Sequence, residues 1–392
     1  MKNIKRVGII TLQSGNNYGA VYQSYALSNY LKSLGFEVFI LNYQMEKPSL
    51  KKCMKHPISL IRKIISRKAF TFNFLRKRGQ HYKGVRREEK FSEIFNEFRE
   101  SYLNITDVFY DYKLLLKNPP AADFYITGSD QVWAADFLFS SPAYLLGFAP
   151  AYAKRISYAP SFGKSSLEPY LEKTFKNYIK RFDAVSVRES GGVKIVKNIA
   201  GIDAVKVLDP TLLISNYSEI IDYSLVPDAP YILLYRLNQD FELATWFNEA
   251  VEKLSRLTGL PIFTVATNCP WDLNSSGTAL HPTPGQLLGL IERSSTFLTN
   301  SFHGTVFSLI FCVKFLSFAR DIFKDKQNLR MIELLDLVDL NDLFCQPFSE
   351  DSSIVKKLDV QIDWDGVHSA LKDARHSSEL FLQNALAINN PN

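Results

Sequence analysis

The sequence predicts an α/β fold built from two parallel sheets. The chain has 392 residues, enough for two or three domains that each bury a core. Strand patterns alternate with helical patterns along residues 7–208, and a second series of the same kind runs along residues 231–311. This alternation builds parallel sheets covered by helices. We therefore expect two Rossmann-like halves with a cleft between them.

The first half begins with a strand, loop, helix and second strand within residues 7–43. The apolar run 7–12 predicts a buried strand, and apolar spacing over residues 20–34 predicts a helix. Gly35 ends that helix before the β-rich run 36–43. Further strands are predicted at residues 124–127, 155–159, 184–187 and 205–208.

A polar segment with two prolines, residues 215–230, predicts a junction between the halves. Beyond it we predict strands at residues 231–235, 262–265 and 296–299 and helices at residues 242–258, 286–294, 304–311 and 364–386. The expected domains are residues 1–215 with an insert at about 48–110, residues 216–345, and a helical extension over residues 346–392.

The charge of the chain is concentrated in one segment. The net charge is +6, yet residues 51–87 hold 13 basic and no acidic residues, which leaves 33 basic against 40 acidic residues elsewhere. Residues 57–68 place isoleucines on one helical face and basic residues mostly elsewhere, as in a helix lying on an anionic membrane. A solvated helix that covers the first domain is the alternative. Nucleic acid is not an expected partner, because no reader motif is present.

Cysteine spacing and hydropathy bear on metal sites, disulfides and membrane spans. The four cysteines are far apart and form no Cys-x-x-Cys pair, so we expect neither a zinc site nor a disulfide framework, and a reducing cytoplasm. Residues 306–313 form the longest apolar run, far below the roughly 18 residues of a membrane span. The run 7–12 is short and indicates a first strand, not a signal peptide.

Loops at the carboxyl ends of parallel strands carry the binding sites of such folds, and two of these loops are rich in polar groups. The loop at residues 14–20 combines glycines with backbone amides before a helix, which favours an anion. A plain turn with an asparagine cap is the alternative. The loop at residues 127–133 gathers hydroxyl, carboxylate, amide and indole groups, which suits carbohydrate. There the alternative is Asp130 as a helix N-cap.

Two further loops contain an arginine and a histidine. Arg188 ends an apolar strand, and its guanidinium could bind a carboxylate or phosphate through two N–H groups at once. A surface ion pair with Glu189 is the alternative. His303 begins a helix after the strand 296–299 and suits proton transfer, and Gly304 leaves room for a ligand. A structural histidine is the alternative. No two histidines have metal-ligand spacing, so no metal is expected.

Six ordered motifs resemble those of bacterial polysaccharide pyruvyl transferases, over about residues 7–343. They are SGNNYGA at 14–20, GSDQVW at 128–133, ISYAPSFG at 156–163, VRE at 187–189, LDPT at 208–211 and SFHGT at 301–305. The resemblance implies a glycosyltransferase-B-like fold. It also implies transfer of pyruvate from phosphoenolpyruvate onto two hydroxyls of one sugar, which gives a cyclic ketal and phosphate without a further cofactor.

The same resemblance implies roles for particular residues. Arg188 and His303 would act in donor handling and proton transfer, and we expect Asp130 to orient or deprotonate the acceptor hydroxyl. Other branches of the family have Arg-Leu-His-Gly where this chain has Ser-Phe-His-Gly. A downstream basic residue is also implied, for which Arg320, Lys324 and Lys326 are candidates. The other expected substrate-binding residues are Asn16, Asn17, Tyr18, Gly19, Ser129, Gln131, Trp133, Tyr158, Ser161, Ser301, Gly304 and Thr305.

The implied acceptor is a nascent surface polysaccharide on a lipid-diphosphate carrier at the inner face of the plasma membrane. Such an acceptor would explain a basic insert over residues 51–87. Two other functions remain open on the sequence. One is a nucleotide-sugar-dependent glycosyltransferase of the same fold, and the other is a non-catalytic scaffold of a glycan-assembly complex.

Overall fold

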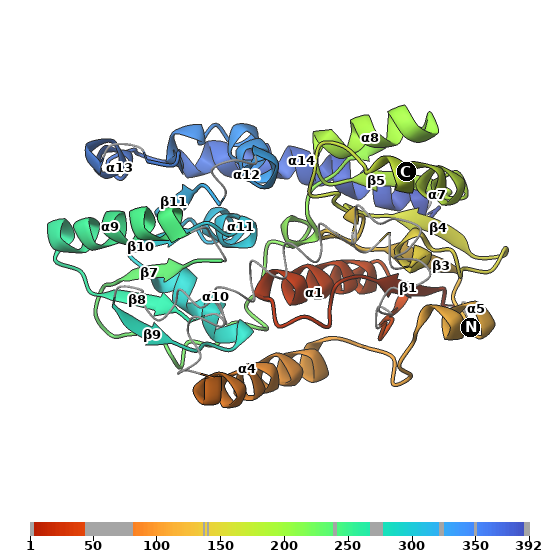
Figure 1. The fold of residues 1–392 in the computed structure, drawn as a ribbon, viewed down its shortest axis with the longest axis horizontal. Coiled ribbons are helices and arrows are strands. Elements are labelled where there is room, and N and C mark those ends of the chain that lie inside the picture. Colours follow the sequence, from red (N-terminus) through yellow and green to blue (C-terminus); the bar gives the residue numbers. More distant parts are fainter. Residues whose placement is uncertain are drawn as a thin grey trace.

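A computed structural model of the protein describes residues 4–43, 81–135, 138, 141–237, 241–266, 277–320, 325–348 and 351–387. The predicted α/β fold is confirmed. Two six-stranded parallel sheets lie in two halves of the molecule, with helices packed around them (Figure 1).

The N-terminal sheet has the order β2-β1-β3-β4-β5-β6. Strands β2 and β3 flank β1 on opposite sides. The register places Ile9 of β1 beside Ile40 of β2 and Ile126 of β3. Strand order therefore reverses at β1, which is where open α/β sheets bind ligands. The strands are β1 Arg6–Ile10, β2 Glu37–Ile40, β3 Phe124–Thr127, β4 Lys154–Ser157, β5 Ala184–Val187 and β6 Val205–Lys206.

The C-terminal sheet has the order β12-β11-β10-β7-β8-β9. Here the order reverses between β7 and β10, where Leu298 pairs with Leu234 on one side and Leu316 of β11 on the other. The strands are β7 Ile232–Tyr235, β8 Ile262–Val265, β9 Thr278–Leu280, β10 Thr296–Thr299, β11 Phe315–Phe318 and β12 Phe344–Cys345.

The helices have local reasons to begin and end where they do. Thr283 and Gln286 form a capping box at the start of α10, and Gly201 in a left-handed conformation ends α8. The α-helices are α1 Tyr18–Ser33, α4 His81–Tyr102, α5 Tyr112–Lys117, α7 Pro169–Ile179, α8 Ser190–Ala200, α9 Phe241–Thr258, α10 Pro284–Arg293, α11 Phe302–Ile310, α12 Asp325–Leu337, α13 Asp351–Lys357 and α14 Trp364–Ala385. Single turns of 3-10 helix lie at η2 Pro142–Leu145, η3 Pro210–Leu212 and η5 Asn341–Leu343.

Helix α1 lies between the two sheets and joins the halves (Figure 1). The Tyr18 hydroxyl donates to the carbonyl oxygen of Pro282 at 2.7 Å, and the Tyr22 hydroxyl donates to that of Pro284 at the same distance. The buried side chains of α1 belong to one hydrophobic cluster with those of the C-terminal sheet. The halves thus share a core.

Helix α14 runs from the C-terminal half back along the N-terminal half (Figure 1). It buries the face that carries Val367, Leu371 and Leu382. Polar contacts fix it to the first half, because the Ser378 hydroxyl accepts from the Leu208 amide at 3.0 Å and Arg375 donates to the Leu212 carbonyl at 2.6 Å.

The predicted amphipathic helix at residues 57–68 lies outside the described residues. Among the helices that the structure describes, none combines the length and the hydropathy of a membrane span.

Candidate active site

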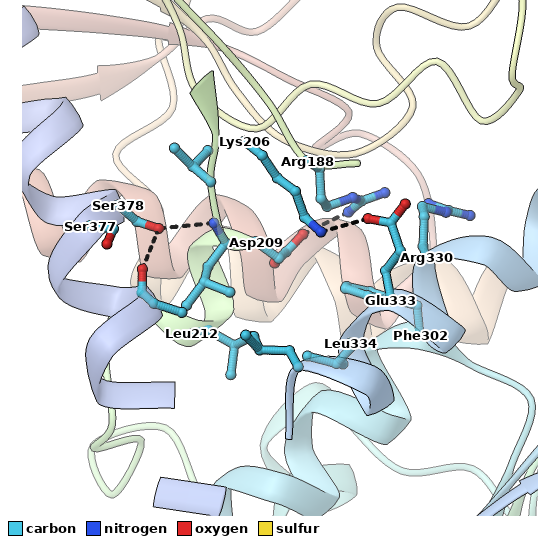
Figure 2. Close-up of a pocket in the computed structure, with 14 residues that line it drawn as sticks. Arg188, Lys206, Asp209, Leu212, Phe302, Arg330, Glu333, Leu334, Ser377 and Ser378 are labelled. Atoms are coloured by element: carbon cyan, nitrogen blue, oxygen red, sulfur yellow. Dashed lines mark hydrogen bonds and ion pairs between the residues drawn. The ribbon is translucent and has the colours of Figure 1, made fainter. Parts of the chain in front are cut away.

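The carboxyl ends of strands from both halves meet around a cavity of about 260 Å³, which we call the interdomain pocket. Its charged residues come from the ends of β5 and β6 and from α12, and α14 closes one side (Figure 2). The lining residues are Arg188, Lys206, Val207, Leu208, Asp209, Leu212, Phe302, Arg330, Glu333, Leu334, Leu337, Ala374, Ser377 and Ser378.

Asp209 lies at the centre of the polar groups. Its side chain is inaccessible to solvent, and its Oδ2 accepts from Nη1 of Arg188 at 2.6 Å and from the Ser129 hydroxyl at 2.9 Å. Its Oδ1 accepts from the amide and the hydroxyl of Thr211, at 3.1 and 2.7 Å. The same Oδ2 lies 3.6 Å from Nε2 of His303. One buried carboxylate therefore connects Arg188 of the first half with His303 of the second.

These contacts decide the charge of Asp209. Burial on its own raises the pKa of a carboxyl group. The charges of His303 and Arg188, and the hydrogen bonds that the carboxylate accepts, outweigh burial and hold the pKa of Asp209 well below its usual range. Asp209 is therefore an anion at neutral pH.

Arg188 follows β5 directly, which explains its burial to 5% exposure at the strand end. The alternative of a surface pair with Glu189 is wrong, since both side chains are buried and Arg188 pairs with Asp209. Burial disfavours its charge, but Asp209 and then Asp130 more than compensate and raise the pKa of Arg188. Its Nε and Nη2 atoms have no hydrogen-bond partner. Part of the guanidinium is thus available to an anion.

His303 lies in the first turn of α11, opposite the start of α1. Its side chain is 12% exposed, and its Nε2 has no hydrogen-bond partner within 3.5 Å. A β-carbon built on Gly19 would lie 2.0 Å from Nδ1 of His303, so only glycine fits at position 19. His303 does not line the interdomain pocket itself. It lies next to two residues that do, Asp209 and Phe302, whose ring packs edge-on against the imidazole at 5.3 Å.

The loop after β3 brings Ser129 and Asp130 to the same place. Asp130 has a left-handed backbone with φ of 71°, and its Oδ1 lies 3.7 Å from Nη2 of Arg188. Its carboxylate also accepts from the Gln131 amide at 2.9 Å. No helix begins at Asp130, so the N-cap alternative is wrong. Gln131 packs against the turn at Gly163.

Three aromatic or hydroxyl residues expected to bind substrate are core residues instead. Trp133 is fully buried, with its indole N–H donating to the carbonyl oxygen of Tyr144 at 3.0 Å. Tyr158 is also fully buried, and the Ser161 hydroxyl donates to Glu189 Oε1 at 3.0 Å. None of the three lines the interdomain pocket, so the prediction of an indole face for sugar binding at Trp133 is not supported.

The residues of the loop 14–20 also differ in burial and in role. Asn16 and Asn17 are exposed, and Asn17 caps α1 by accepting from the Ala20 amide at 3.3 Å, as the asparagine-cap alternative predicted. Tyr18 is buried, and its hydroxyl donates to Pro282 of the C-terminal half. Gly19 lies against the imidazole of His303.

The start of α11 is closed by its own side chains. The Ser301 hydroxyl accepts from the Gly304 amide at 3.2 Å, and Thr305 is buried with its hydroxyl 2.7 Å from that of Ser317. A β-carbon on Gly304 would lie 2.7 Å from the Thr299 hydroxyl, so Gly304 is required by packing, not by space for a ligand.

Of the three expected downstream basic residues, Arg320 can be placed, and it does not line the interdomain pocket. The Arg320 amide donates to Asn328 Oδ1 at 2.8 Å. Lys324 lies outside the described residues, and for Lys326 the structure describes the backbone alone. Among the described residues that follow β11, Arg330 of α12 is a basic residue that lines the pocket.

The sequence reasoning missed three residues of the site. Asp209 was detectable, since the motif LDPT places a carboxylate directly after a predicted strand. Arg330 and Glu333 had no signal of their own, because both lie inside a helix rich in charged residues.

Solved structures of other proteins share the fold. The structure of S. aureus MnaA with UDP has a TM-score of 0.53 at 10% identity, over 98% of each chain. A putative UDP-N-acetylglucosamine 2-epimerase from Listeria monocytogenes has a TM-score of 0.53 at 10% identity, over 100% of this chain and 99% of its own. A glycosyltransferase from Rickettsia africae has a TM-score of 0.51 at 12% identity, over 98% of each chain. The glycosyltransferase-B-like fold is thereby confirmed.

No curated protein matches the chain in sequence. The sequence profile described as polysaccharide pyruvyl transferase matches residues 17–322, which include Gly19, Asp130, Arg188, Asp209 and His303. The match spans well over half of the 392 residues. The chain belongs to the polysaccharide pyruvyl transferase family.

Proposed function

We propose that this protein transfers pyruvate from phosphoenolpyruvate onto two hydroxyls of one sugar, with a cyclic ketal and phosphate as products. The observation that carries the proposal is the buried contact series Arg188, Asp209, His303 in a chain of this family. It combines a cation whose Nε and Nη2 make no hydrogen bond to the protein with an imidazole beside a fixed anion, which are the groups that the reaction needs.

The donor brings a carboxylate and a phosphate, so it requires cations. Arg188 offers Nε and Nη2, neither of which donates a hydrogen bond to a protein group, although Nη2 lies 3.7 Å from Asp130. Arginine binds carboxylate and phosphate through parallel N–H groups. The amino-terminal end of α11 adds a favourable dipole for negative charge. Arg188 is therefore the proposed donor-binding residue.

The chemistry begins with a proton. His303 protonates the methylene carbon of phosphoenolpyruvate, which turns C2 into an electrophile, and Asp209 stabilises the imidazolium before the transfer. One sugar hydroxyl attacks C2, the bond from C2 to the phosphate oxygen breaks, and the second hydroxyl closes the ring. Of the two hydroxyl protons, one replaces the proton that His303 gave and the other leaves with phosphate.

Asp130 is the proposed contact to the acceptor. Its side chain is 19% exposed, in contrast to the inaccessible carboxylate of Asp209. A carboxylate that is partly solvated and near Arg188 can accept a hydrogen bond from a sugar hydroxyl and take its proton. Asp130 thus orients or deprotonates the acceptor.

We further propose that the acceptor is a saccharide of a surface polysaccharide on a lipid-diphosphate carrier, and that residues 51–87 contact the anionic inner face of the plasma membrane. Basic residues near such a surface each contribute about 1 kcal/mol. Replacing Arg62, Lys63, Arg67 and Lys68 by Gln should reduce sedimentation with anionic vesicles and leave the background with neutral vesicles unchanged. Equal sedimentation of the variant and the parent protein would refute the membrane contact.

The reaction itself is tested by incubating the protein with phosphoenolpyruvate and lipid-linked glycans. We expect phosphate release and a glycan whose mass increases by a ketal-linked pyruvate. The competing function, a nucleotide-sugar-dependent glycosyltransferase of the same fold, predicts a glycan that gains a sugar instead. If a nucleotide-sugar raises the melting temperature and phosphoenolpyruvate does not, the pyruvyl transfer proposal is refuted.

A further inference from the structure

Arg330 is a buried cation for which the described residues supply no ion-pair partner. It lies in α12 with 8% of its surface exposed and lines the interdomain pocket. Its Nε has no hydrogen-bond partner, and among the described residues no carboxylate lies within 4.0 Å of its guanidinium nitrogens. A buried charge without a partner is costly, so its presence requires a reason.

Its surroundings add to that cost. Burial and then the like charge of Arg188 lower the pKa of Arg330 to about 10, which Glu189 and Asp130 offset in part. The guanidinium carbon of Arg188 lies 5.0 Å from the centre of the Phe302 ring, and that of Arg330 lies 5.9 Å from the same centre. Two guanidinium groups are thus held on one aromatic ring. An anion between them would relieve their repulsion.

The other charges of the pocket are already paired. Lys206 forms an ion pair with Glu333 at 2.8 Å (Figure 2). Glu333 also accepts from the amide and hydroxyl of Ser190 at 3.2 Å. Arg188 satisfies Asp209 through Nη1 alone. The positive charge left for a ligand therefore comes from Arg330 and from the remaining N–H groups of Arg188.

Helix geometry explains why Arg330 faces the pocket. The pocket residues of α12 are Arg330, Glu333, Leu334 and Leu337, which recur with the spacing of one helical face. Arg330 and Glu333 of this face line the pocket together with Arg188 and Lys206, and its leucines form part of the apolar wall. The position of Arg330 is thus fixed by the packing of the whole helix.

We propose that Arg330 and Arg188 form a two-guanidinium site on the Phe302 ring that binds the phosphate group of the donor. Two arginine forks suit a phosphate dianion, which can accept hydrogen bonds on three oxygens. The assignment of this phosphate to phosphoenolpyruvate rests on the proposed function, whereas the phosphate site itself does not. The diphosphate of a nucleotide-sugar would supply the same chemistry.

The test measures ligand affinity by thermal shift with phosphoenolpyruvate, inorganic phosphate and uridine diphosphate as separate probes. The variants are Arg330→Gln, Arg330→Lys and, as a matched control, Arg293→Gln, whose arginine is 62% exposed on the surface. Arg330→Gln should weaken binding of the phosphate-bearing probes at least tenfold, Arg330→Lys should weaken it less, and Arg293→Gln should leave it unchanged. The melting temperature of ligand-free Arg330→Gln should stay equal or rise, because an unpaired buried charge is removed.

In turnover assays, Arg330→Gln should raise the KM for phosphoenolpyruvate and leave the KM for the acceptor unchanged. Parent-like affinity of Arg330→Gln for every phosphate probe would overturn the inference, as would a parent protein that binds none of them. If the parent protein binds uridine diphosphate alone and Arg330→Gln loses that binding, the phosphate site stands and the pyruvyl donor is wrong. A large drop in the ligand-free melting temperature with unchanged affinity would assign Arg330 a structural role.

Discussion

Gly19 of α1 lies directly against the His303 imidazole of α11, so closely that a β-carbon at position 19 would come within 2.0 Å of Nδ1. The contact joins the first loop of the N-terminal half to the histidine of the C-terminal half. Gly19 lies against the Nδ1 edge of the imidazole, whereas Nε2 lies 3.6 Å from Asp209 Oδ2. These two contacts fix the orientation of the ring, and the His303 side chain stays 12% exposed.

Gly19→Ala should displace the imidazole by about an ångström and lower turnover roughly 100-fold, because misplacing a reacting group by that distance has such an effect. The measurement is phosphate release from phosphoenolpyruvate with acceptor present. Gly15→Ala is the matched control, since a β-carbon there meets no atom within 4 Å. Full activity of Gly19→Ala would show that the position of His303 does not matter.

His303→Ala should lower phosphate release by about 10²–10⁴-fold, the usual effect of removing a general acid. The fold should persist, as judged by the melting temperature. His376→Ala is the control, because that histidine is exposed on α14 and does not line the pocket. Unchanged turnover of His303→Ala removes this residue from the mechanism.

Asp209→Asn should destabilise the protein by about 3–5 kcal/mol at pH 7, since it leaves the buried Arg188 without its counter-ion. The pKa of Asp209 is lowered in the folded state, so its stabilisation is complete above the unfolded value of about 4 and is lost as the pH falls through the folded value. Denaturation of the parent and variant should therefore converge at acidic pH. Asp203→Asn, at a carboxylate with 85% exposure, should change stability little at any pH.

Trp133→Ala should reduce stability by about 3–5 kcal/mol, the range for truncating a buried aromatic side chain. The acceptor KM of the folded fraction should not change, because the indole does not line the pocket. Chemical denaturation and acceptor titration measure the two effects separately. A parent-like stability combined with a raised acceptor KM would restore Trp133 as a sugar-binding residue.

Much of the fold was predictable because its main strands are short apolar runs with polar loops at their carboxyl ends. Strands β3, β5, β8 and β10 have the predicted bounds. Strand β11 was not predicted, since Phe315–Phe318 follows the apolar α11 after a brief turn and periodicity does not separate the two. Strands β9 and β12 have three and two residues, too few for any pattern.

The site was predictable where a loop follows a strand. Arg188 and His303 were found on this rule, and the structure brings both to Asp209. Trp133 satisfied the same rule, but its side chain turns into the core. This was not predictable, because a loop sequence does not reveal which way a side chain points. Arg330 was missed for the opposite reason. It reaches the pocket from the middle of a helix, through a tertiary contact that no local pattern encodes.

The hydroxyls of Tyr18 and Tyr22 on α1 donate to backbone carbonyls of the opposite half and so tie the two halves together. Opening the halves as rigid bodies would break both bonds and expose part of a shared core. The distance between the first glycine loop and the histidine is therefore established when the chain folds. Substrates meet a preorganised centre, and the energy of their binding is available for the reaction instead of for domain closure.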